Sequence, residues 1–355
     1  MTPWYPTTNA PESGIFVARE AAALGEEHEV RVLHLDWTGD MDASLLRQDD
    51  VDARRIVLRR SRPFDFGRAR RAVRTAAAWA DVVHTHALTG LLPWIFGGRP
   101  ASRPWVHSEH WSGVSAPETL GAAERAVLRA LRPALARPDV VVAESERLAA
   151  AIRSHRRGLT TIVPCVVPDA VPQARPPGVV LVAVGGLIPR KGPLLAVGAL
   201  AALRGRDIAA TLTWVGDGPL REDVVKEAAG LGVADSITLT GTLDDAGVAG
   251  ALDAASLFIL PTQGDNFCVV AAEALVHGRP IVSGAATGAV DYASPAVSEF
   301  VAVQTPAAYA DAIVRVHEKT RDLPAASVAA SVAGRFTALT VRTQLEVVYQ
   351  AARAR

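Results

Sequence analysis

Two cations stand in a short, glycine-bounded loop of this 355-residue sequence, where an apolar run gives way to a helical pattern. The loop GGLIPRKGP begins with Gly185 and Gly186 and carries Arg190 and Lys191 directly before the helical pattern. Because only three residues of the chain are lysines, a lysine here does not reflect habitual use of that residue. Backbone amides at a helix start, together with a cation, form a favourable site for phosphate. A solvated loop without a ligand is the alternative.

Two acids lie eight residues apart in a second loop and the helix expected to follow it. Asp265 precedes a helix that should begin near Cys268, and Glu273 lies further into that helix, so both can face a ligand over the helix start. Four amides there could donate hydrogen bonds to phosphate oxygens, those of Asn266, Phe267, Cys268 and Val269. The alternative makes Asp265 a helix cap and Glu273 a surface charge. Against it, the neighbours of Glu273 have the composition of buried helix packing: Ala271, Ala272, Ala274 and Leu275.

Four histidines close apolar runs, which raises the question of a metal site. His84, His86, His107 and His110 follow strand alternation and do not have the spacing of zinc ligands, so we predict no metal. The acidic triplet DMD at 40–42 lies in the wrong sequence context for a metal motif and does not change this prediction.

Apolar runs that alternate with helical stretches must position these loops. The N-terminal half has apolar runs at 30–35, 80–86, 104–110 and 139–145, and helical stretches at 15–25, 67–80 and 117–135. The C-terminal half has apolar runs at 179–184, 211–216, 236–241, 256–261 and 280–284, and helical stretches at 192–204, 219–230, 244–254 and 268–277. This rhythm is typical of parallel sheets covered by helices, which bind ligands at the carboxyl ends of their strands.

The length of the chain and one proline-rich segment favour two domains. Single cores rarely grow beyond about 250–300 residues, and the segment 164–178 reads as an interdomain linker. At the beginning, TPWYPTTNAPESG has the character of a loop that follows a strand, yet only Met1 precedes it. We therefore expect the first strand to be missing, and a true N-terminus upstream of Met1 is one explanation.

The charge balance bears on whether nucleic acid or membrane is a partner, and the cysteine content bears on the cellular compartment. Basic and acidic residues balance at 37 each, so no overall field favours nucleic acid or membrane. Two cysteines, no secretory leader and no apolar run of about 18 residues predict a cytoplasmic protein. The Arg-rich segment 54–74 holds nine arginines and one acid, and it could meet the inner membrane face or a phosphorylated acceptor, or be merely solvated.

The loop that carries Asp265 resembles the signature of the retaining family 4 glycosyltransferases, P-S-x-x-E-G-F-G-x-x-x-x-E-A-x-x-x-G-x-P-V. The matching positions are Pro261, Phe267, Glu273, Ala274, Gly278 and Pro280. VGGLIPRKG resembles the family's V-G-R-L-x-x-x-K-G, VGDGP resembles its G-x-G-P, and PESGIFV resembles its S-G-I-F-V. This resemblance implies the α/β GT-B fold, in which two Rossmann-like, doubly wound domains face a central cleft.

The resemblance also implies a division of labour along the chain. An acceptor-binding domain would span 1–165, a sugar-nucleotide-binding domain 179–335, and a C-terminal helix at 336–355 would pack back toward the first domain. The implied catalytic residues are His110 facing the donor sugar, Lys191 at the diphosphate and Asp265 at the sugar hydroxyls. The implied donor-binding residues are Gly14 near the phosphates, Glu273 at the ribose, and Gly185, Gly186, Arg190, Lys191, Asn266, Phe267, Cys268 and Val269.

Three positions depart from the family pattern. Gly186 replaces an arginine, Asp265 replaces the first glutamate of the signature, and Cys268 replaces a glycine. Loss of the arginine removes one of two cations expected on the leaving diphosphate, and Arg190 is placed to replace it.

The implied activity is transfer of a hexosyl or related sugar from a nucleoside diphosphate sugar to an acceptor hydroxyl, with retention of configuration. The resemblance requires no cofactor, and it leaves open the base, the sugar and the acceptor, whether a small molecule, a glycan or a lipid-linked compound. Two alternatives stay open: a catalytically impaired GT-B binding or partner subunit, motivated by Gly186, and a sugar-nucleotide epimerase.

Overall fold

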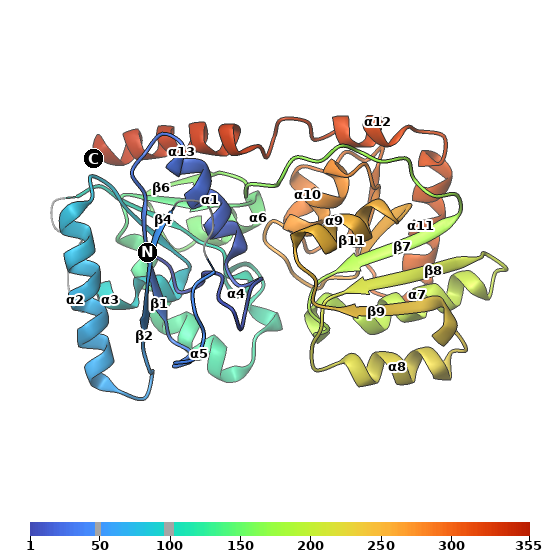
Figure 1. Cartoon of the computed structure of the whole chain (residues 1–355), viewed down its shortest axis with the longest axis horizontal. Coiled ribbons are helices and arrows are strands. Elements are labelled where there is room, and N and C mark those ends of the chain that lie inside the picture. Colours follow the sequence, from blue (N-terminus) through green and yellow to red (C-terminus); the bar gives the residue numbers. More distant parts are fainter. Residues whose placement is uncertain (47–50, 96–102) are drawn as a thin grey trace. The chain divides into compact units, whose positions relative to one another are not determined.

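The structure is a computed structural model that describes residues 1–46, 51–95 and 103–355. It consists of two α/β units: unit 1 comprises residues 1–167 and 335–355, and unit 2 comprises residues 168–334 (Figure 1). The expected linker at 164–178 is therefore not a separate segment, because the chain from Pro168 onward belongs to unit 2. Hydrogen bonds hold it there: Arg279 Nη2 donates to Gln173 O at 2.8 Å, and Arg175 Nη2 donates to Leu323 O at the same distance.

Unit 2 contains one parallel sheet of six strands in the order β12-β11-β10-β7-β8-β9. The strands are β7 (Val179–Val184), β8 (Ala210–Val215), β9 (Ile237–Gly241), β10 (Leu257–Leu260), β11 (Ile281–Gly284) and β12 (Ser298–Val301). The helices are α7 (Pro193–Arg204), α8 (Arg221–Gly230), α9 (Asp245–Asp253), α10 (Val269–Val276), α11 (Pro306–Thr320) and α12 (Ala325–Ala330). Because β7 lies between β8 and β10, the strand order reverses beside β7, and this reversal is the switch point where such sheets bind ligands.

Unit 1 contains two groups of parallel strands. In the first group β1 (Arg31–Asp36) pairs with β2 (Asp52–Val57). The second group has the order β3-β4-β5-β6, with β3 (Val83–His86), β4 (Trp105–Ser108), β5 (Val140–Ala143) and β6 (Leu159–Ile162). The helices are α1 (Ile15–Gly25), α2 (Pro63–Trp79), α3 (Leu92–Ile95), α4 (Ser112–Ser115), α5 (Ala122–Leu131), α6 (Glu146–Arg153) and α13 (Ala338–Arg353).

Met1 and Thr2 lie where a strand between these two groups would run. Thr2 N donates to Leu33 O at 3.0 Å, and Leu35 N donates to Thr2 O at 2.8 Å, on the β1 side. On the β3 side, His86 N donates to Met1 O at 2.9 Å. Residues 1–2 thus connect β1 to β3 in a doubly wound order, at the position of the strand that was expected to be missing.

Helix α13 completes the core of unit 1. It packs against α1, β4 and β5 (Figure 1). Its residues Val341, Leu345 and Val348 are buried in a cluster that includes Leu24 and Val106. Among the described residues, no helix is both long and apolar enough to cross a membrane.

Candidate active site

The switch point of unit 2 brings together the two loops singled out in the sequence. The loop after β7 and the loop after β10 touch, and Lys191 Nζ lies 2.5 Å from Asp265 Oδ2. Their backbones are also joined, since Gln263 N donates to Arg190 O at 2.8 Å. Gly192 permits this approach: its φ is +68°, and a Cβ atom there would lie 2.2 Å from Pro261 O, which excludes any other residue without a shift of the backbone.

Asp265 uses both oxygens of its carboxylate. Oδ2 accepts the Lys191 ammonium and lies 3.8 Å from Arg190 Nη1, while Oδ1 accepts the backbone N–H of Cys268 at 3.0 Å. Burial alone would raise the pKa of Asp265, but Lys191, Arg190 and the Cys268 amide outweigh it and hold that pKa below its ordinary value. The carboxyl group is therefore a fixed anion between two cations and the start of α10.

The hydrogen bond from Cys268 N bears on the two roles considered for Asp265. As the cap alternative requires, Asp265 accepts an amide at the helix start. Its role toward the sugar hydroxyls stays a prediction. The Cys268 amide is consequently engaged by Asp265, so a phosphate could use it only after Asp265 moves. Phe267 packs inward on Tyr292 with ring centroids 5.0 Å apart, and Asn266 is buried as well.

The backbone conformation at Cys268 is one that favours glycine, the residue that the resembled family has at this position. Cys268 has φ +63°, in the left-handed region that favours glycine, and it stands directly before the first residue of α10. The side chain is buried, which is the main reason that the pKa of its thiol rises to about 12. This buried cysteine is therefore a packing group.

Glu273 lies half-buried on α10, whereas its neighbours Ala271, Ala272, Ala274 and Leu275 are fully buried. A role of Glu273 toward a ligand therefore stays a prediction. Gly185 and Gly186 lie beside the WVGDGP turn, because Gly185 N donates to Val215 O and Leu187 N donates to Asp217 O, both at 2.9 Å.

In unit 1, Gly14 is the residue before the first turn of α1 and has φ +72°. A Cβ atom there would lie 2.4 Å from the carbonyl carbon and oxygen of Trp4. Glycine is required twice over at this position, by its backbone conformation and by the loop packed against it.

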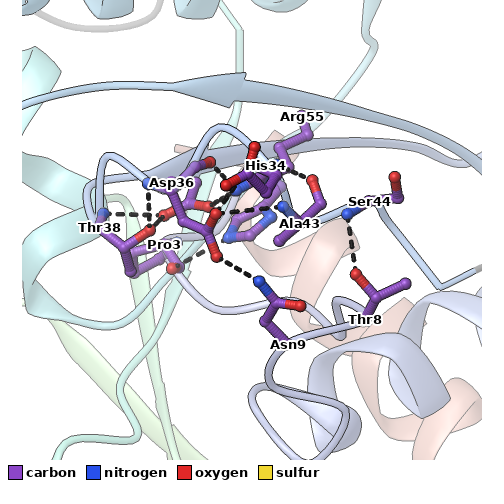
Figure 2. A network of polar contacts seen from close by, with 11 residues as sticks. Pro3, Thr8, Asn9, His34, Asp36, Thr38, Ala43, Ser44 and Arg55 are labelled. Carbon is purple, nitrogen blue, oxygen red and sulfur yellow. Dashed lines mark hydrogen bonds and ion pairs between the residues drawn. The ribbon is translucent and has the colours of Figure 1, made fainter.

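A polar network that the sequence did not reveal fixes the loop before Gly14 (Figure 2). Arg55 on β2 forms an ion pair with Asp36 at the end of β1, and both side chains are at most 10% exposed. Asp40, from the DMD triplet, accepts Asn9 Nδ2 at 2.8 Å and the backbone N–H of Asp42 at 2.9 Å. Asp40 thus orders a turn in this loop.

His110 lies in unit 1, in the loop after β4. Its Nδ1 contacts Glu144, its Nε2 lies 3.1 Å from His86 Nδ1, and Phe16 packs on its ring at 4.6 Å between centroids. Burial opposes the charged imidazolium, yet the Glu144 carboxylate raises the pKa of His110 above its ordinary value. The sequence did not single out Glu144, although its place at the end of β5 was a signal.

Two family models match the chain. The model for "Glycosyltransferase Family 4" matches residues 14–171, and that for "Glycosyl transferases group 1" matches residues 178–319. A Streptomyces fradiae protein described as 2-deoxystreptamine N-acetyl-D-glucosaminyltransferase is 30% identical over 302 residues, which cover 75% of this chain and 70% of that protein. The chain belongs to the group 1 glycosyltransferases. A Streptomyces kanamyceticus relative of this glycosyltransferase, described as 2-deoxystreptamine glucosyltransferase, is 27% identical and covers 72% of each chain.

Solved structures show the same fold. Sucrose-phosphate synthase from Thermosynechococcus elongatus aligns with a TM-score of 0.79 at 20% identity and covers 96% of this glycosyltransferase and 93% of its own chain. Anabaena HepE in complex with UDP and glucose aligns with a TM-score of 0.75 at 19% identity, covering 95% and 96%. The glycosyltransferase therefore has the GT-B fold, with two α/β domains built on parallel sheets.

Proposed function

We propose that this glycosyltransferase moves a sugar from a nucleoside diphosphate sugar to an acceptor hydroxyl with retention of anomeric configuration. The observation that carries the proposal is the contact of Lys191 with Asp265 at the switch point of unit 2. A loop with two cations, a helix start and a fixed carboxylate meet there. The cations and the helix start suit a diphosphate, and the carboxylate suits the hydroxyl groups of a sugar.

The donor would bind through its diphosphate to Lys191, which exchanges Asp265 for a phosphate oxygen. Arg190 would supply the second cation, because Gly186 stands where the resembled family has an arginine. The Arg190 guanidinium already lies 3.8 Å from Asp265 Oδ2 and donates to Gly264 O. Asp265, released from Lys191, would accept hydroxyl groups of the sugar, and Glu273 would accept those of the ribose. Each contact is a charge-assisted hydrogen bond of the stronger kind.

The chemical step would be departure of the nucleoside diphosphate from the anomeric carbon. The cations stabilise the negative charge that develops on the leaving phosphate oxygen. The acceptor hydroxyl would attack the face from which the leaving group departs and pass its proton to that phosphate, which gives retention. His110, held by Glu144, would position the sugar and would not act as a nucleophile.

For the acceptor we propose a hydroxyl group of a cyclitol ring. The names of the relatives support this class: two are transferases of 2-deoxystreptamine, and others of inositol 3-phosphate or a phosphatidylinositol mannoside. All of these acceptors contain a polyhydroxylated six-membered carbon ring.

Lys191→Ala tests the site directly. Loss of a cation that stabilises the leaving group should lower turnover at least about a hundredfold, and Lys226→Ala, on the exposed surface of α8, should leave it unchanged. A panel of sugar nucleotides, screened first by thermal shift, would identify the donor for the assay. Near-normal turnover of Lys191→Ala would exclude the proposed role. Nucleotide binding without transfer would favour an impaired partner subunit, and donor conversion without acceptor would favour an epimerase.

We also propose a peripheral membrane contact through the Arg-rich segment 54–74. Phe64 at the start of α2 is 88% exposed, and Arg60, Arg62 and Arg68 around it are exposed as well. Co-sedimentation with vesicles containing anionic phospholipid should fall after the combined change Arg60→Ser and Arg62→Ser. Equal binding to neutral vesicles would contradict the proposal.

A further inference from the structure

Three side chains that the proposed transfer reaction does not use converge inside unit 1. Glu20 lies on α1, and His84 and His86 lie on β3. The two histidines are two residues apart on one strand, so their side chains lie on the same face of the sheet. Their rings are stacked with centroids 4.2 Å apart, and all three side chains are at most 13% exposed.

Two distances within this cluster are close to the distance between two ligands of one ion. His84 Nδ1 lies 3.5 Å from Glu20 Oε1, and His86 Nε2 lies 3.6 Å from the same oxygen. These are long for hydrogen bonds. Ligand atoms at about 2.0–2.1 Å from a tetrahedral zinc ion lie about 3.4 Å from each other, which is close to both values. One ligand atom from each residue lies within 4.8 Å of those of the other two.

The second nitrogen of each histidine is held by a neighbour. His84 Nε2 lies 2.8 Å from Ser108 Oγ, and His86 Nδ1 lies 3.1 Å from His110 Nε2. Metal-binding histidines are usually oriented in this way, with the outer nitrogen bonded to a polar group and the inner nitrogen turned to the ion. Here the inner nitrogens are the two that face Glu20.

The surroundings leave room for a further ligand. Glu20, His84 and His86 line a cavity of about 1210 Å³ that lies within unit 1. Tyr349 on α13 contributes its hydroxyl, 2.9 Å from His84 Nδ1, and the amino group of Met1 donates to His84 O at 2.7 Å. Metal binding would replace the Tyr349 hydrogen bond, because His84 Nδ1 has one lone pair.

From this geometry we propose that Glu20, His84 and His86 form a binding site for a divalent transition metal ion of the zinc class. Two histidines and one carboxylate suit zinc, and the cavity supplies a position for a water ligand. The ion would join α1 to β3 and stabilise unit 1. This proposal does not depend on the proposed transfer reaction, because its ligands lie outside the Lys191 site.

The test is calorimetric titration of the whole, tag-free protein with zinc chloride after dialysis against a chelator, with cobalt as a spectroscopic substitute. We expect one ion per chain, visible absorption bands of tetrahedral cobalt, and a raised thermal midpoint. Glu20→Gln and His84→Gln should each weaken binding at least about a hundredfold, since each removes a direct ligand.

Two variants make the result decisive. Tyr349→Phe removes a polar group of the same cluster that is not a ligand, so it should bind the ion at least as tightly as the natural protein. His277→Gln removes the His277 partner of Asp253 on unit 2, a histidine–carboxylate pair at 2.8 Å, and should leave the stoichiometry unchanged. Binding that survives Glu20→Gln, or that is lost in folded Tyr349→Phe, would overturn the proposal, as would the absence of binding to the natural protein.

Discussion

At the scale of single residues, Asp265 links the two loops of the candidate site. One oxygen accepts the Lys191 ammonium and the other accepts the Cys268 amide, so the same carboxylate orders a cation and a helix start. Its replacement should therefore separate two properties, the binding of nucleotide and the transfer of sugar.

Asp265→Asn should abolish sugar transfer while nucleotide binding is largely retained. The amide side chain preserves the shape but removes the charge that holds Lys191 and would orient the sugar hydroxyls. Calorimetry with the nucleoside diphosphate, alongside a transfer assay, measures both properties. Loss of both together would mean that Asp265 supports the fold of the site and has no separate role toward the sugar.

The lowered pKa of Asp265 has a consequence for stability at acid pH. The group is more acidic in the folded state, so its contribution to stability is fully present above the unfolded pKa of about 3.9. That contribution is lost as pH falls through the lower, folded-state pKa. The difference in unfolding free energy between the natural protein and Asp265→Asn, measured in urea, should therefore be constant from pH 7 to about pH 5 and shrink below about pH 4.

At the scale of elements, the start of α1 depends on a glycine whose backbone no other residue adopts easily. Gly14 combines φ +72° with close packing against Trp4. The network of Asp36, Arg55 and Asp40 then holds the loop that carries Trp4.

Gly14→Ala should destabilise the protein by at least about 1–3 kcal/mol, from backbone strain and the clash with Trp4. Gly67→Ala is the matched control, because Gly67 lies in α2 with no atom within 4 Å of its expected Cβ. It should be neutral or stabilise by about 0.5–1 kcal/mol. Equal unfolding midpoints of the two variants in urea would show that the loop carrying Trp4 can shift without a loss of unfolding free energy.

Elements whose apolar residues are buried on both faces were predictable from the sequence. The runs that became β5, β7 and β10 are short, apolar and almost wholly buried, which is what a central parallel strand requires. Strands β2, β6 and β12 were not predicted, because half or more of the residues in each are exposed or half-buried and none has an apolar run.

The candidate site was predictable to the extent that it lies in local motifs. Lys191 and Asp265 stand in loops that a parallel sheet brings to one edge, Glu273 lies on the helix that follows the second loop, and a family resemblance singled out all three. Glu144 beside His110, Arg55 beside Asp36, and Glu20 beside His84 are contacts between distant elements. The spacing of residues along the chain does not predict such contacts. The four histidines alone therefore gave no reason to expect a set of metal ligands.

At the scale of the whole molecule, unit 1 is assembled from the two ends of the chain. Leu345 on α13 is fully buried in the cluster that contains Leu24 and Val106. Leu345→Ala should cost about 2–5 kcal/mol, because it leaves a cavity in that core.

The loss should appear in unit 1 and not in unit 2, which hydrogen exchange resolved by peptide can establish. Amides of β4 and β5 should exchange faster, while those of β7 and β10 keep their protection. Leu339→Ala, at a position on the same helix that is 60% exposed, serves as the control and should change stability by about 0.5 kcal/mol or less. Faster exchange throughout both units would mean that they unfold as one.

The late position of α13 affects the order in which the protein folds during translation. Domains generally fold as they emerge from the ribosome, the N-terminal one first. Here all strands of unit 2 are synthesised before α13 appears, whereas unit 1 waits for that helix to cover Leu24 and Val106. The second unit can therefore finish folding while the first still exposes apolar surface, and a premature stop codon before Ala338 would damage the part of the protein that was made first.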